Sequence, residues 1–218
     1  MSSKKQPTDS FAVIGAGMSG VLAGIKLKEA GHPFTIFEKA DRVGGTWREN
    51  TYPGIACDVP SHIYSYSFEL NPDWSEFTSP GAEVQEYFER VSKRYGIDEH
   101  IRFNEAVIRC TWMDGEWEIE TEKGHIECVR WVIAATGILH HPKYPDIDGL
   151  DTFEGPMFHT ARWDHDIDIT GKRIGLIGTG SSGVQITAAV APEVENLTEF
   201  QRCLLYTSPS PRDRTRSR

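Results

Sequence analysis

The sequence predicts an α/β fold of two similar strand–turn–helix–strand units, with a β-meander inserted in the first unit and the second unit truncated. Apolar runs at residues 11–14 and 172–177 each lead into a glycine-rich turn, and residues at helical spacing follow. A strand, a tight turn, a helix and a second strand within about 30 residues form a βαβ unit, in which the two strands are parallel. The second unit repeats the first, so one device occurs twice in the chain.

The first unit has a predicted strand at 11–14, a helix that Gly31 ends, and a strand at 34–37. A second helix opens after Ser79, the expected N-cap, with Pro80 in its first turn. Gly96 closes this helix, and its apolar residues follow the helical period. These residues are Val84, Tyr87, Phe88, Val91 and Tyr95.

A β-meander is predicted after this helix. Three β-rich runs at 106–113, 116–121 and 125–131 are separated by Asp-Gly and Lys-Gly pairs, which are typical of hairpins. We expect the meander's tryptophans to be packing residues rather than site residues: Trp112, Trp117 and Trp131. The third run continues into an apolar strand over 132–135.

An irregular connection rich in His, Pro and Asp covers residues 140–170. The second unit follows, with a strand at 172–177, a helix from Val184 and a strand at 197–201. Within the connection, His140 and His141 do not have the spacing of metal ligands, so they are interpreted as loop residues and no metal site is predicted.

The composition excludes several classes of protein. A net charge of −9 argues against a nucleic-acid binder. No run approaches the roughly 20 apolar residues of a membrane helix, and the polar N-terminus is not typical of a signal peptide. The four cysteines form no CxxC pair, which disfavours a zinc site, a disulfide framework and a disulfide reductase. We therefore expect a cytoplasmic protein without stable membrane insertion.

The last 16 residues differ in composition from the rest. Residues 203–218 hold four arginines and one aspartate, have no periodicity and follow the last strand without a turn signal. They look like a sequencing adaptor translated in frame, although a natural basic tail is the alternative. If the tail is non-native, residues 1–202 are a fragment of a longer protein.

The first glycine-rich turn predicts a dinucleotide site. Gly15-Ala-Gly17-Met-Ser19-Gly20 fits G-x-G-x-x-G between a strand and a helix. The first glycine makes the turn, the second admits a pyrophosphate, and the third packs the helix on the strand. Glu38, at the end of the next strand, can accept bonds from ribose hydroxyls and would repel a 2′-phosphate. This site is expected to hold FAD.

The second turn repeats the pattern as Gly178-Thr179-Gly180-Ser181-Ser182-Gly183. The charge at the end of the following strand differs between the two units. Gln201 stands where the first unit has Glu38, and Arg202 follows it. Losing the acid and gaining a guanidinium favours NADPH over NADH, whereas the alternative is a surface arginine at a strand end. Two dinucleotide sites in one chain imply hydride transfer between nicotinamide and flavin.

Further motifs give a resemblance to a known family. Arg42-Val-Gly-Gly-Thr-Trp47, Tyr52-Pro-Gly54 and Cys57-Asp58 follow the first unit. Between the units stands Phe153-Glu-Gly-Pro-Met-Phe-His159-Thr-Ala-Arg-Trp163-Asp164, which fits F-x-G-x-x-x-H-x-x-x-W-D without a mismatch. Over residues 10–202 the chain resembles the class B flavoprotein monooxygenases, specifically the Baeyer–Villiger monooxygenases. N-oxygenating relatives usually have Tyr or Phe in place of Trp163.

The resemblance implies roles for individual residues. His159 and Trp163 would couple domain movement to the cofactor cycle, and Asp58 would pair with an arginine beyond the end of this chain. The residues implied to bind FAD are Gly15, Gly17, Ser19, Gly20, Glu38, Gly45, Thr46, Trp47, Asp58, Tyr64, Val107, Thr136 and Gly137. Those implied to bind NADPH are Gly178, Thr179, Gly180, Ser181, Ser182, Gly183 and Arg202.

Four of these residues have a purely structural role as the alternative. His159 could be a hydrogen-bonded linker histidine and Trp47 a core residue. Tyr64 lies in an aromatic run that resembles a buried strand, and Asp58 could cap a turn.

The implied domains are a flexible N-terminus (1–9), the N-terminal part of an FAD-binding domain (10–144), a linker with the first half of an NADPH-binding domain (145–202), and the tail (203–218). The overall class is a pair of Rossmann-like units, the FAD/NAD(P)-binding fold.

The implied reaction is a Baeyer–Villiger oxidation that depends on NADPH and O₂. A C4a-peroxyflavin would insert oxygen next to the carbonyl of a small ketone. An N- or S-oxygenating flavin monooxygenase and an inactive FAD-binding scaffold are the alternatives. Because relatives are more than twice as long, we expect the 218-residue chain alone to be inactive.

Overall fold

The structure is a computed structural model that describes residues 9–201. It divides into two compact units, Met1–Asp164 and His165–Arg218, and each is described by itself. Arg202 and the predicted tail lie outside the described residues, so the structure does not test those predictions. The predicted division into FAD and NADPH domains concerns function and stays a prediction.

The first unit is built on a parallel sheet, as predicted. Its strand order is β3-β2-β1-β7, and α1 joins β1 to β2. The elements are β1 (Phe11–Ile14), α1 (Met18–Glu29), β2 (Phe34–Phe37), β3 (Ile101–Arg102) and β7 (Trp131–Ala134). The helix begins at Met18, so the last residues of the glycine pattern already belong to its first turn.

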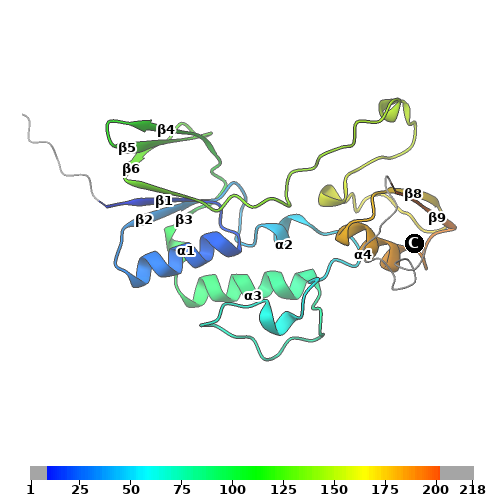
Figure 1. Cartoon of the computed structure of the whole chain (residues 1–218), viewed down its shortest axis with the longest axis horizontal. Helices are drawn as coiled ribbons and strands as arrows, with labels where there is room; N and C mark the ends of the chain where they lie inside the picture. Colours follow the sequence, from blue (N-terminus) through cyan, green and yellow to red (C-terminus); the bar gives the residue numbers. More distant parts are fainter. Residues whose placement is uncertain (1–8, 202–218) are drawn as a thin grey trace, which may run out of the picture. The chain divides into compact units, whose positions relative to one another are not determined.

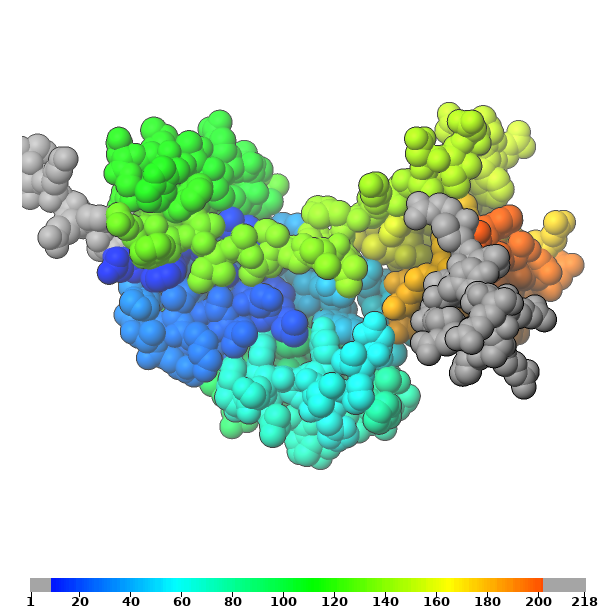
Figure 2. Space-filling view, viewed as in Figure 1, coloured from blue at the N-terminus to red at the C-terminus, as the bar shows by residue number. Residues whose placement is uncertain are grey.

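Two layers cover this sheet, one on each face. Helices α1 and α3 (Gly81–Arg94) lie on one face, and the meander lies on the other (Figure 1). The meander appears in green on one side of the blue first βαβ unit in Figure 2, with the cyan segment before α3 on the opposite side. Its strands confirm the prediction: β4 (Val107–Met113), β5 (Glu116–Thr121) and β6 (Ile126–Val129).

Alternation along the strands divides the core between these two layers. In β1 and β2, Val13 and Ile36 point toward the helices, whereas Ala12 and Phe37 join the meander residue Ile119. Successive side chains of a strand point to opposite faces, so four-residue strands can supply both cores. The fully covered sheet also explains why these strands are nearly all apolar.

The start of α3 corrects one expectation. Its N-cap is Pro80, and no side chain caps the helix, so the prediction of Ser79 as N-cap is wrong. The Ser79 hydroxyl turns back to donate to the Glu76 carbonyl at 3.3 Å, and the Ser79 amide donates to Ser61 Oγ at 2.7 Å. The Ser79 hydroxyl is thus directed to the Glu76 carbonyl, and its oxygen accepts no amide of the helix. The apolar stripe of α3 was predicted correctly, and Val84, Tyr87, Phe88 and Val91 are buried.

The tryptophans of the meander contact other rings. Trp117 is partly buried against the meander core, and Trp112 meets it edge to face at 5.4 Å. Trp131 stacks on Phe11 at 6.3 Å. About half of the surface of Trp112 and Trp131 remains exposed, 53% and 49%.

The remaining segments of the first unit are short. They are α2 (Thr46–Glu49) and the 3₁₀ turns η1 (Ser61–Ile63), η2 (Asp98–His100), η3 (Leu150–Thr152) and η4 (Thr160–Arg162). The connection from residue 140 is irregular apart from η3 and η4, as predicted. Across residues 9–201, no helix has both the length and the apolar character that a membrane span requires.

The second unit contains one βαβ arrangement. Parallel strands β8 (Arg173–Ile177) and β9 (Asn196–Phe200) are joined by α4 (Ser181–Val190). The helix begins three residues before Val184 because Gly180 is its N-cap, so both serines of the glycine pattern lie in the first turn.

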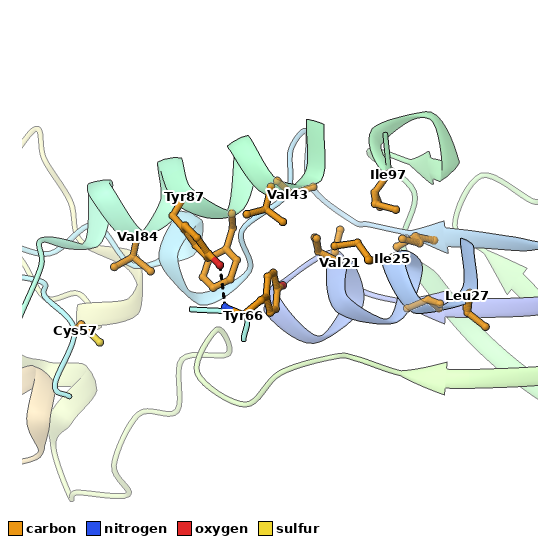
Figure 3. Close-up of a cluster of buried hydrophobic side chains, with 14 of the residues drawn as sticks. Val21, Ile25, Leu27, Val43, Cys57, Tyr66, Val84, Tyr87 and Ile97 are labelled. Atoms are coloured by element: carbon orange, nitrogen blue, oxygen red, sulfur yellow. Dashed lines mark hydrogen bonds between the residues drawn. The ribbon is translucent and has the colours of Figure 1, made fainter. Parts of the chain in front are cut away.

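One buried hydroxyl ties the core of the first unit to its loops. Tyr87 Oη accepts the Tyr66 amide at 2.8 Å (Figure 3). It also donates to the Glu69 carbonyl at 2.6 Å. The Tyr87 side chain is 1% exposed. Removing its hydroxyl would therefore leave a buried amide without this acceptor.

Tyr87→Phe is expected to lower the free energy of unfolding by about 1–3 kcal/mol, because an unsatisfied buried donor costs that much. Urea denaturation of both proteins measures the difference. Tyr144→Phe, at a tyrosine that is 48% exposed, is the matched control and should change stability little. Equal effects of the two substitutions would contradict the role of the buried hydroxyl.

Candidate functional site

A cavity of about 450 Å³ opens at the carboxyl ends of β1, β2 and β7 in the first unit. This end of a parallel sheet is where α/β proteins bind ligands. The cavity gathers segments that lie far apart in the sequence: the glycine turn, the end of β2, the loop through α2, the start of β4 and the chain after β7. Its lining includes the predicted residues Gly15, Gly17, Ser19, Glu38, Gly45, Thr46, Trp47, Tyr64, Val107, Thr136 and Gly137.

The first glycine turn is tight because three backbone segments meet there. Gly15 has a φ of +99°, and a Cβ on it would lie 2.6 Å from the Ala135 carbonyl oxygen. A Cβ on Gly20 would overlap the Gly15 carbonyl oxygen, so the third glycine packs helix on strand as predicted. Gly20 contributes to the turn and does not line the cavity.

The second glycine faces another glycine across the cavity floor. A Cβ on Gly17 would lie 3.4 Å from Gly45 Cα, and one on Gly45 would lie 2.9 Å from Gly17 Cα. Gly45 has a φ of +56°, and the neighbouring Gly44 amide donates to the Ala16 carbonyl at 3.0 Å. The close approach of the two loops therefore requires glycine at position 45, whereas a Cβ on Gly17 would make an ordinary contact.

Helix α1 begins at this floor without an acceptor of its own. Its N-cap is Gly17, no side chain caps it, and no acidic residue lies in its first turn. Amide donors at a helix N-terminus, together with the helix dipole, favour an anionic group. The start of α1 is thus suited to a phosphate.

Glu38 is a buried carboxylate that is 3% exposed and lines the cavity. It accepts the Ala16 amide at 2.7 Å and the Ala40 amide at 3.0 Å. Arg48 Nη1 lies 3.2 Å from Glu38 Oε1, the oxygen that also accepts the Ala40 amide, and only 7% of the Arg48 side chain is exposed. Glu38 therefore stabilises the glycine turn directly, and a buried guanidinium balances its charge.

Sequence reasoning missed an ion-pair chain that starts at Glu38. Arg48 also binds Glu49 at 2.7 Å, and Arg162 approaches Glu49 at 3.2 Å. Burial raises the pKa of Glu49, but the hydrogen bond and charge of Arg48, helped by Lys39 and Arg162, outweigh burial and hold this pKa below its ordinary value. No spacing rule connects Arg48 to Glu38 or Glu49 to Arg162, because these residues lie in separate segments of the sequence.

An aromatic pair forms one side of the cavity. Trp47 Nε1 donates to Tyr64 Oη at 3.2 Å, and the rings meet edge to face at 5.5 Å. Burial raises the pKa of Tyr64, which keeps the phenol neutral. Asp58, also predicted at this side, is exposed and does not line the cavity. Its predicted role stays a prediction.

The fingerprint residues His159 and Trp163 take part in local contacts. His159 Nδ1 accepts the Ala161 amide at 3.0 Å and so caps η4. Burial, and then the charge of Arg162, lower the pKa of His159. The Trp163 ring meets Phe158 edge to face at 5.0 Å. These are the contacts of a hydrogen-bonded linker histidine, and a role in domain movement stays a prediction.

The glycine turn of the second unit repeats the first in its own backbone. Gly178 has a φ of +109°, and a Cβ on Gly183 would lie 2.5 Å from the Gly178 carbonyl oxygen. Gly180 is the N-cap of α4, with no side-chain cap and no acidic residue in the first turn. Gln201 is exposed, and Arg202 lies outside the described residues.

Three of the four cysteines lie within residues 9–201. Within this range no cluster of His, Cys, Asp and Glu could hold a metal ion, and Cys57, Cys110 and Cys128 are free.

Glu49 gives the site a predicted dependence on pH. Its pKa is lower in the folded chain than the ordinary value of 4.5, so its contribution to stability is present above that pH and is lost as pH falls through the folded pKa. Glu49→Gln should therefore lower stability near neutral pH, and the deficit should shrink below pH 4.5. Urea denaturation at several pH values measures it. Glu86→Gln, at an exposed glutamate of α3, is the control, and an equal pH dependence for both variants would contradict the assignment.

Comparison with known proteins identifies the family of the chain. Residues 12–198 match the family described as pyridine nucleotide-disulphide oxidoreductase. A Baeyer–Villiger monooxygenase of Streptomyces coelicolor is 47% identical over 91% of this chain, which spans 38% of that protein. An open crystal structure of cyclohexanone monooxygenase is 39% identical with a TM-score of 0.84, covering 94% of this chain and 41% of that one.

A crystal structure of OTEMO in complex with FAD and NADP is 34% identical with a TM-score of 0.85, covering 96% of this chain and 43% of that one. The chain thus spans well under half of the proteins that it matches. It belongs to the pyridine nucleotide-disulphide oxidoreductase family, and its resemblance to the Baeyer–Villiger monooxygenases is confirmed.

Proposed function

We propose that the protein is a flavin monooxygenase that uses NADPH and O₂ to insert oxygen next to the carbonyl of a small ketone. FAD would occupy the cavity of the first unit, and NADPH would bind at the glycine turn of the second. The observation that carries the proposal is the Gly17–Gly45 floor beside Glu38, since it joins a dinucleotide fingerprint to the loop motif of the Baeyer–Villiger resemblance.

The cavity has features that suit FAD. Its volume lies within the range of known ligand pockets, roughly 300–1,000 Å³. The glycine floor and the start of α1 would face the pyrophosphate, as in dinucleotide sites generally. Glu38 lines the cavity and could accept from ribose hydroxyls while it retains the Ala16 amide. OTEMO, which contains FAD, has the same fold over this region.

The chain's own residues would bind and orient this cofactor. Thr46 and Trp47 would lie along it, with Tyr64 toward its ring system, and Val107, Thr136 and Gly137 would close the site. Asp58 would act beside the ring system, with an arginine from outside this chain. Bound FAD supplies the electron transfer and oxygen activation, and the protein supplies a site from which water is excluded.

NADPH is assigned to the second unit because neutral Gln201 and basic Arg202 follow β9. The residues that would hold it are Gly178, Thr179, Gly180, Ser181, Ser182, Gly183 and Arg202. The start of α4 has the same uncapped donors as α1, and Gln201 replaces the acid that would repel a 2′-phosphate. A location in the cytoplasm and the coupling roles of His159 and Trp163 remain part of the proposal.

Gly45→Ala is expected to abolish stable FAD binding, because its Cβ would sit 2.9 Å from Gly17 Cα at a positive φ. FAD titration followed by flavin fluorescence measures the affinity. Gly124→Ala is the control: Gly124 has a φ of +76°, but a Cβ there meets nothing within 4 Å. FAD binding by Gly45→Ala at wild-type affinity would contradict the proposed floor.

The activity is tested on the protein encoded by the full reading frame that contains this chain. We expect NADPH oxidation coupled to conversion of cyclohexanone into its lactone. Arg202→Gln should reduce the preference for NADPH over NADH by about tenfold or more, because charge-assisted bonds to the phosphate are lost. Oxygenation of sulfides or amines but not ketones would replace the proposal with a heteroatom oxygenase.

A further inference from the structure

The chain after β7 forms one wall of the cavity but buries little apolar surface. Residues Ile138, Leu139, His140 and His141 line the cavity. Ile138 is 90% exposed and Leu139 is 62% exposed. Apolar packing therefore contributes little to holding this wall, because the hydrophobic effect scales with the area removed from water.

Two side chains instead hold the wall by its backbone carbonyls. Asn50 Nδ2 donates to the Leu139 carbonyl at 3.0 Å and to the Thr46 carbonyl at 2.9 Å. Arg162 Nη2 donates to the His140 carbonyl at 2.8 Å. Asn50 directly follows α2, and the wall runs beside that helix in Figure 1.

Arg162 is itself held by the ion-pair chain. Its Nη1 lies 3.2 Å from Glu49 Oε2, while the other oxygen of Glu49 binds Arg48 at 2.7 Å. Arg48 in turn reaches Glu38 at 3.2 Å, and Glu38 accepts the Ala16 amide of the glycine turn. A continuous series of charged contacts thus runs from the cavity floor to the wall.

The chemistry of arginine suits this double contact. A guanidinium offers several donors in a fixed plane, so one side chain can bind a carboxylate and a carbonyl at once. Lysine has a single ammonium on a flexible stem and cannot reproduce the planar fork.

We propose that Arg162 is a positioning residue that, anchored by Glu49, holds the 138–141 wall closed over the nucleotide in the first unit. The inference rests on the proposed binding of FAD. It states that Arg162 lowers the rate at which FAD dissociates. Arg162 acts through the wall and through Glu49, without touching the reacting atoms.

The test combines two measurements on the 218-residue chain. Hydrogen exchange of the peptide spanning residues 137–144 is measured without FAD, and FAD dissociation is measured after dilution of the loaded protein. Arg162→Met should raise wall exchange and FAD dissociation by about tenfold each, as expected for loss of charge-assisted hydrogen bonds. Arg162→Lys should give intermediate values for both.

Two comparisons separate positioning from general stability. Arg94→Met removes a surface arginine that binds Glu69 at 2.6 Å, and it should leave both rates unchanged. The double variant Glu49→Gln/Arg162→Met should dissociate FAD no faster than Glu49→Gln alone, if Arg162 acts through Glu49.

Wild-type exchange of the wall in Arg162→Met would overturn the inference, and so would raised exchange with unchanged FAD dissociation. If neither the unmodified chain nor the protein encoded by the full reading frame binds FAD, the proposed function fails. The exchange measurement without FAD still decides whether Arg162 holds the wall.

Discussion

The site depends on the approach of three backbone segments to the glycine turn after β1. Gly15 lies against the Ala135 carbonyl of β7's extension, Gly20 against Gly15 itself, and Gly17 against Gly45. A side chain on Gly15 or Gly20 would separate the turn from the chain after β7 or from the start of α1, and one on Gly45 would push the 44–49 loop away from the turn. The same contacts fix the start of α1, so the donors at the helix end and the cavity floor arise from one steric constraint.

The ion pair between Glu38 and Arg48 stabilises the approach of these backbone segments. Glu38 is buried at the end of β2, where an isolated carboxylate would be costly, and Arg48 compensates it at 3.2 Å. Two backbone amides complete its hydrogen bonds. Because Arg48 also binds Glu49, the loop that carries Gly45 is attached electrostatically to the strand that carries Glu38. The floor of the cavity is thus held by sterics on one side and by a buried ion pair on the other.

The sequence predicted the periodic and glycine-bearing parts of this structure, and it failed where contacts are non-local. The strands at Phe11–Ile14 and Phe34–Phe37 and the stripe of α3 follow from apolar spacing, which local physics determines. The cap of α3 was assigned incorrectly because Ser79 lies in a buried loop, where its hydroxyl is directed to the Glu76 carbonyl and not to the amides of the helix. Arg48 was missed because its pairing with Glu38 depends on how the loop after β2 folds back. Arg162 was missed because its pairing with Glu49 depends on how the 140–162 connection folds back, and no spacing rule encodes either.

The two glycine turns show how far a fingerprint can predict a site. Both have a positive φ at the first glycine and a third glycine packed on the first. A Cβ on Gly15 would meet Ala135, whereas a Cβ on Gly178 or Gly180 would meet nothing within 4 Å among the described residues. The motif therefore specifies the turn and the start of the helix that follows. In the first unit the cavity forms where other segments approach that turn, namely the 44–49 loop and the chain after β7, both remote in sequence from the glycines.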